Sequence, residues 1–162
     1  SISLSGYTFG RAEREERWWL VCGIEGLWEM ETATAEAVRE REKVAYETIQ
    51  EHGFSVERLL GRGLYSEEAG WREADAVAWM AFRYLEETNG VEKIQSIVQE
   101  SVTQHVTRRD GRPVFRDMIR RVPLVFRQET GRTLEEFVEG AREYIESHGK
   151  AAVESLEEGG EA

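Results

Sequence analysis

The chain has 162 residues and a formal net charge of −11, from 21 Lys and Arg residues against 32 Asp and Glu residues. Hydrophobic residues make up 40% and charged residues 33%, a balance that excludes a disordered chain and an integral membrane protein. No run approaches the roughly 18 apolar residues that a membrane-spanning helix needs. The acidity also argues against a nucleic-acid binder, because the phosphate backbone would repel such a chain overall.

The residue types favour a mainly α fold. Only 2 prolines occur in the chain, which fits long helices, and the length suits a single domain with a real core. The lone Cys22 excludes an internal disulfide and a cysteine-based zinc ribbon. No secretory pattern is present at the start, and the compartment and the oligomeric state are left open. We therefore expect one domain of about six helices, with room for a short N-terminal strand.

Residues 1–10 alternate in a broken, glycine-containing pattern that is typical of a short edge strand or an extended arm. Helical spacing then begins, and it predicts a helix from Ala12 to Met30. Gly23 and Gly26 lie inside this helix, where each costs about 1 kcal/mol relative to Ala. The two glycines therefore indicate that another part of the chain packs closely against the helix.

The next segments carry clear start and stop signals. A second helix is expected over Thr34–Glu51, with Thr34 as its N-cap and Gly53 just after its end. A short helical turn is expected over Ser55–Leu60. The strongest helical pattern is Trp71–Thr88, whose wide apolar stripe predicts a central helix that ends at Asn89 and Gly90.

The last part of the chain predicts three further helices. One is expected over Val91–Val102, and a second begins at Pro113 and ends at Pro123, because proline breaks a helix interior. Leu124–Phe126 would then be a short connector. A capping box at Thr133–Glu136 opens the last helix. We expect the helical domain to span residues 1–149 and residues 150–162 to form an acidic, frayed tail.

Large side chains and histidines give two further expectations. Cys22 is expected to be a buried thiol. Four tryptophans are expected to anchor the core: Trp18, Trp19, Trp71 and Trp79.

The histidines are His52, His105 and His148, and none has a second His or Cys one helical turn away. We therefore predict no metal site, no cofactor and no catalytic residue. His52 and His148 precede glycines, which suggests helix C-terminal ends, and His105 is expected at the surface.

Glu25 stands apart from the many other carboxylates. Its neighbours Gly23, Ile24, Gly26, Leu27 and Trp28 are small or apolar, and a buried unpaired carboxylate would be costly. One interpretation is that its side chain simply reaches solvent past the glycines. The other is that it has a cation, a metal or a hydrogen-bonding group as a partner.

Arginines cluster in one segment. Arg112, Arg116 and Arg120 follow one another at intervals of four residues, so on a continuous helix they would form a basic stripe. This stripe either pairs with the domain's own glutamates or binds an anionic partner. Aromatic residues are not interleaved with the arginines, which again argues against nucleic acid.

Three segments resemble the gluzincin zinc metallopeptidases of the peptidase MA group. WWLVCGIEGLWEM (Trp18–Met30) is similar to the family's helix whose Glu is the third zinc ligand. GWREADAVAWMAFRYLEETNGVEKI (Gly70–Ile94) resembles a later helix, and FRQETGRTLEEFVEGAREYI (Phe126–Ile145) resembles the closing segment. The segments occur in family order. The resemblance implies a helical domain like the C-terminal part of a gluzincin, with Glu25 at the third-ligand position.

The sequence also departs from the family. A gluzincin has H-E-x-x-H about twenty residues before the ligand Glu, to supply two zinc imidazoles and the general base. The corresponding segment here, Ile2–Gly6, reads ISLSG. We therefore expect a non-catalytic, metallopeptidase-like domain that binds a peptide or protein, or else part of a larger peptidase.

Two alternatives remain open. One is a helical interaction or regulatory module, unrelated to peptidases, that binds an anionic partner through Arg112, Arg116 and Arg120. The other is an enzyme that a second chain or further sequence completes. The resemblance makes one geometric prediction: the helix with Glu25 packs against the helix that begins at Trp71, and Glu25 faces a cleft.

Overall fold

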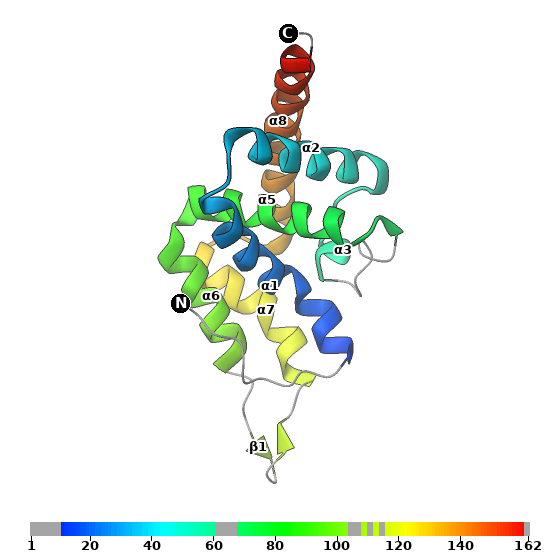
Figure 1. The fold of residues 1–162 in the computed structure, drawn as a ribbon. Helices are drawn as coiled ribbons and strands as arrows, with labels where there is room; N and C mark the ends of the chain where they lie inside the picture. Colours follow the sequence, from blue (N-terminus) through cyan, green and yellow to red (C-terminus); the bar gives the residue numbers. More distant parts are fainter. Residues whose placement is uncertain (1–10, 61–67, 104–107, 110–111, 114–115, 161–162) are drawn as a thin grey trace.

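The structure is a computed structural model that describes residues 11–60, 68–103, 108–109, 112–113 and 116–160 (Figure 1). Within these residues the chain is a mainly α single domain, as the sequence predicts. The elements are α1 (Arg11–Glu31), α2 (Ala35–His52), α3 (Val56–Leu60), α5 (Trp71–Asn89), α6 (Val91–Thr103), β1 (Arg108–Arg109), β2 (Arg112–Pro113), α7 (Arg116–Thr130) and α8 (Leu134–Gly160). The two short strands pair antiparallel. No helix in the described part of the chain is long and apolar enough to cross a membrane.

Helix α5 forms the centre of the domain. It packs against α1, α2, α6 and α8, and Figure 1 shows α1 crossing in front of it with α2 above. Its middle is buried on nearly every side, from Ala76 through Phe82. This burial explains the unusually wide apolar stripe, because a helix covered on all sides has no face for charged residues.

The close contact between α1 and α5 depends on glycine. A Cβ atom added at Gly23 would lie 2.1 Å from the ring of Phe82, and one added at Gly26 would lie 2.8 Å from Cβ of Trp79. Trp19 lies on the same side of α1 and meets Phe82 edge-on, with ring centroids 5.4 Å apart. The predicted close approach is therefore confirmed, and its partner is the central helix.

The predicted helix signals at α2 and α8 are confirmed. The Thr34 side chain accepts a hydrogen bond of 3.1 Å from the backbone N–H of Ala37. Gly53 ends α2 with a φ of 80°, a left-handed conformation that favours glycine. At α8, Thr133 accepts a bond of 3.2 Å from the N–H of Glu136.

The structure differs from the sequence-based expectation beyond Gly149. Helix α8 continues to Gly160 rather than fraying from residue 150, and Ala152 is buried. A Cβ at Gly149 would lie 2.1 Å from Cβ of Tyr46, so this glycine permits the contact between α8 and α2. A glycine that looks like a helix end in sequence is thus a helix-crossing point in three dimensions.

Two further expectations, both about prolines, were wrong. Helix α7 runs through Pro123 to Thr130, so Leu124–Phe126 is helical rather than a connector. Burial of Val122, Val125 and Phe126 stabilises this helix despite the missing proline N–H. Pro113 is not a first helical residue, because it lies in β2.

The tryptophans divide between the core and the surface. Trp19 is 0% and Trp79 2% exposed, as expected, but Trp71 is 65% exposed and is not part of the core. Trp71 is the first residue of α5, and the next residue, Arg72, is exposed as well. The Trp18 side chain and the expected strand in residues 1–10 lie outside the described residues.

Candidate functional site

Glu25 lies on the outer face of α1. The helix packs against α5 as the resemblance predicts, but the Glu25 side chain is exposed and does not line any of the three hollows described below. Its apolar sequence neighbours Ile24 and Leu27 turn toward the core, since successive helical residues point about 100° apart. Among the described residues, no group of three or more His, Cys, Asp or Glu side chains could hold a metal ion.

Cys22 is half-buried next to α5 rather than fully buried. Burial raises the pKa of the Cys22 thiol, and its hydrogen bond to Asp75 and the nearby charge of Glu25 raise this pKa further. The thiol therefore remains protonated at neutral pH. A protonated thiol is a poor nucleophile, so Cys22 is a structural residue in this fold.

The histidines occupy different settings. His52 is the last residue of α2, as expected, and its Nδ1 lies 3.4 Å from a carboxylate oxygen of Glu68. His148 is not at a helix end: it lies within α8, where Nδ1 is 2.9 Å from the carbonyl oxygen of Tyr144. His105 lies outside the described residues.

The predicted arginine stripe is not continuous. Arg112 lies in β2, whereas Arg116 and Arg120 are one turn apart on α7. The prediction of one helical stripe of three arginines is therefore wrong. The spacing of four residues is regular, but Arg112 pairs with Arg109 of β1, and α7 begins only at Arg116.

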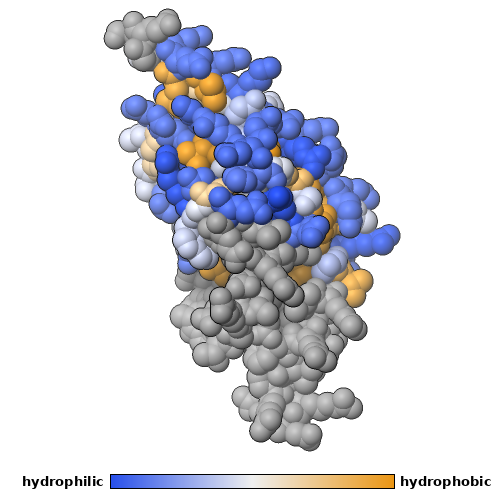
Figure 2. Space-filling model, turned by 90° about the vertical axis from the view of Figure 1, so that its right-hand side faces the viewer, coloured by the Kyte–Doolittle hydropathy of each residue, from blue (hydrophilic) through white to orange (hydrophobic). Residues whose placement is uncertain are grey.

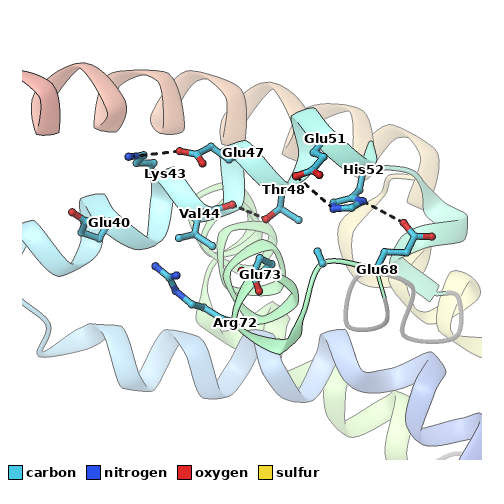
Figure 3. Close-up of a pocket in the computed structure, with 11 residues that line it drawn as sticks. Glu40, Lys43, Val44, Glu47, Thr48, Glu51, His52, Glu68, Arg72 and Glu73 are labelled. Atoms are coloured by element: carbon cyan, nitrogen blue, oxygen red, sulfur yellow. Dashed lines mark hydrogen bonds and ion pairs between the residues drawn. The ribbon is translucent and has the colours of Figure 1, made fainter.

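An acidic pocket lies between α2 and the N-terminal end of α5 (Figure 3). Its volume is about 360 Å³. The residues that line it are Glu40, Lys43, Val44, Glu47, Thr48, Glu51, His52, Glu68, Ala69, Arg72 and Glu73. Five of these are glutamates, so unpaired they would attract cations.

Many charges in the acidic pocket are already paired. Glu68 accepts a 2.7 Å hydrogen bond from Arg58, which lowers the pKa of Glu68, and nearby His52 lowers this pKa further. Lys43 lies 3.7 Å from Glu47. These exposed pairs contribute little stability each. The pocket therefore consists largely of ion pairs that satisfy one another, and its chemistry does not point to a ligand.

A second polar hollow adjoins this pocket. It has a volume of about 590 Å³ and lies between α1, α2 and α5. Its lining residues are Glu29, Ala37, Glu40, Arg41, Val44, Arg72 and Asp75. Arg41 of α2 is paired with Glu29 of α1 at 3.4 Å, so two of the charged residues that line this hollow compensate each other.

The third hollow is apolar, and we call it the Trp28 groove. It has a volume of about 410 Å³ and lies where the C-terminal end of α1, helices α2 and α5, and the start of α6 meet. Its lining residues are Leu27, Trp28, Met30, Glu31, Val38, Trp79, Arg83, Glu86 and Val91. Trp28 and Val91 are each 50% exposed. By contrast, the face shown in Figure 2 is hydrophilic over most of its described area.

Two arginines hold the inner wall of the Trp28 groove in place. The Arg83 guanidinium lies 4.9 Å from the Trp79 ring centroid and 3.2 Å from a carboxylate oxygen of Glu42, which is buried. The Arg41 guanidinium lies 5.6 Å from the same ring. Cation–π contacts of this kind fix the orientation of the indole. The wall is therefore preformed.

This groove was not predicted from the sequence, although one signal was present. Trp28 follows Trp19 by nine residues, which places it about half a turn away on a helix. A large apolar residue opposite the buried face of an amphipathic helix is a signal of a contact surface. What could not be read from sequence is that Val38 and Val91 would lie beside it.

The comparisons with known proteins found no family model, no curated protein and no solved structure that matches this chain.

Proposed function

We propose that this chain is a non-catalytic, metallopeptidase-like helical domain that binds an apolar side chain of a peptide or protein segment in the Trp28 groove. Three sequence segments in gluzincin order and the packing of α1 on α5 support the relationship. Hydrolysis is not assigned to this chain, because its sequence contains neither the two imidazoles nor the general base of H-E-x-x-H.

The observation that carries this proposal is the apolar lining of an open groove. Its volume of about 410 Å³ is sufficient for a large side chain, and Trp28 leaves half of its surface in water. Half-exposed tryptophans beside a hollow are typical of the residues that dominate protein–peptide binding. Burying the Trp28 ring against a partner would remove its apolar surface from water.

A peptide titration tests the proposal. The probe is the capped peptide Gly-Gln-Phe-Gln-Gly, added to the ¹⁵N-labelled chain while amide chemical shifts are recorded. We expect saturable shifts at Trp28, Met30 and Val91. Trp28→Ala should weaken binding at least about fivefold, since loss of a binding tryptophan costs more than ~1 kcal/mol.

Trp71→Ala is the matched control. Trp71 is also an exposed tryptophan, but it does not line the groove. This variant should bind the peptide as the unchanged chain does. Shifts elsewhere on the surface, or an equal loss in both variants, would contradict the assignment of the groove.

The exposed position of Glu25 favours a second candidate, in which this chain is part of a larger peptidase. A carboxylate on the uncovered face of α1 is available to a metal that other groups hold. Calorimetric titration of zinc into a longer protein that contains this chain tests this. Tight one-to-one zinc binding that is lost in the Glu25→Gln variant would contradict the non-catalytic proposal and support this second candidate.

Binding of an anionic partner through arginines is supported less well. Only Arg116 and Arg120 share a helix, so the stripe that motivated this alternative is shorter than expected. The domain's net charge of −11 also opposes an anionic partner.

A further inference from the structure

We infer that the segment bound in the Trp28 groove carries a lysine or arginine next to its apolar side chain. This inference rests on the proposed function and specifies the class of partner. It follows from the carboxylates at the edge of the groove, from the pairing of its one arginine, and from the charge of the domain.

Two glutamates lie at the edge of the apolar lining. Glu31 is the last residue of α1, Glu86 lies near the end of α5, and both side chains are exposed. Within the described ranges, no salt bridge joins either carboxylate to a cation. A cationic group on a bound segment would therefore gain two partners without breaking an existing pair.

Arg83 does not offset these charges. Its guanidinium is 3.2 Å from Glu42 and stacks on Trp79, so its charge is already compensated inside the protein. The lining thus presents apolar surface with two uncompensated negative charges. An acidic segment would meet repulsion at both carboxylates, and an anionic lipid headgroup would meet the same repulsion.

The net charge of the whole domain also favours a cationic partner. A net charge of −11 attracts cationic segments during encounter and repels anionic ones. This long-range attraction has no preferred location, whereas Glu31 and Glu86 would place the cation beside the groove. The experiment therefore separates the local effect from the overall charge.

The test compares three capped peptides: Gly-Lys-Phe-Lys-Gly, Gly-Gln-Phe-Gln-Gly and Gly-Glu-Phe-Glu-Gly. Dissociation constants come from the chemical shifts of groove amides at one fixed ionic strength. We expect the lysine peptide to bind about three- to tenfold more tightly than the glutamine peptide, because each exposed ion pair changes an equilibrium by up to about fivefold. The glutamate peptide should bind most weakly.

Charge-neutralising variants locate the effect. Glu31→Gln combined with Glu86→Gln should remove most of the difference in affinity between the lysine and glutamine peptides. Glu154→Gln combined with Glu157→Gln changes the net charge equally on exposed residues of α8, outside the groove, and should retain the preference.

Each outcome has a distinct meaning. Equal binding of the lysine and glutamine peptides, with Trp28-dependent affinity, would overturn the cationic inference and leave the proposed function intact. Equal loss of preference in both double variants would overturn the role of Glu31 and Glu86. If no peptide shifts the groove amides, the proposed function fails, and the inference fails with it.

Discussion

On the inner face of α1, Gly23 and Gly26 let the helix approach Phe82 and Trp79 closely, and both of these side chains are buried. On the outer face, one or two residues away in sequence, Glu25 and Trp28 are exposed. The inner face is close-packed and intolerant of added atoms. The outer face has no such constraint, and it carries part of the binding surface that we propose.

This contrast shows why sequence neighbours mislead on a helix. The sequence left open whether Glu25 reaches solvent or has a partner, and the structure shows it exposed, because Ile24 and Leu27 turn toward the core while Glu25 does not. Residues next to each other in sequence point about 100° apart, so a buried neighbour says little about burial. For the same reason, the sequence neighbours of Trp28 did not indicate that its side chain is exposed. We expect Trp28 to act in binding rather than in packing.

The largest expected effect distinguishes a core tryptophan from a surface one. Trp79→Ala should lower the free energy of unfolding by about 3–5 kcal/mol, because it removes a buried indole and leaves a cavity. Trp71→Ala should change it by less than about 0.5 kcal/mol. Urea denaturation measures both. Similar losses in the two variants would contradict the placement of these side chains.

The next effect tests the close contact of α1 with α5. Gly23→Ala should destabilise the fold by about 1–3 kcal/mol, since the new methyl group would meet the buried Phe82 ring. Gly159→Ala is the control, because a Cβ there has no neighbour within 4 Å and alanine favours a helix. It should be neutral or stabilising. A neutral Gly23→Ala would show that the helices lie farther apart.

A smaller effect concerns the stability of the fold at alkaline pH, which depends on Tyr144 at the edge of the core. Burial raises the pKa of Tyr144 to about 12, the charge of Glu87 adds to this shift, and Arg83 opposes it. Because the pKa is about 10 in the unfolded chain, the stabilisation is complete below pH 10 and is lost as the pH rises toward 12. Tyr144→Phe should therefore lose less stability than the unchanged chain over this range. Parallel pH profiles from denaturation would contradict the shift.

The smallest effect concerns the outer face. Glu25→Gln should change the free energy of unfolding by less than about 0.5 kcal/mol, because the side chain is exposed. The measurement is urea denaturation, alongside Gly23→Ala. A loss comparable to that of Gly23→Ala would mean that Glu25 has a partner inside the fold.

Local signals in the sequence predicted the helices well. Thr34, Gly53 and Gly90 mark helix ends because caps satisfy the backbone groups of a terminal turn, a requirement that does not depend on the rest of the fold. The central position of α5 followed from its wide apolar stripe. The pair Gly23 and Gly26 correctly indicated a close approach, although not its partner.

Other features required the packing to be known. Gly149 resembles a helix stop, but Tyr46 of α2 lies against it and α8 continues. Pro123 should break a helix, but burial of its neighbours in α7 outweighs the lost backbone bond. Arg112 matched a helical spacing that its strand does not follow.

The sequence by itself determined the fold class, most helix ends and the lack of H-E-x-x-H, because each depends on residue types and short spacings. Only the tertiary structure decided which face of α1 is covered and that Trp28, Val38 and Val91 meet in one groove. The reason is physical: local backbone chemistry sets helix ends, whereas a groove depends on how separate helices pack against one another.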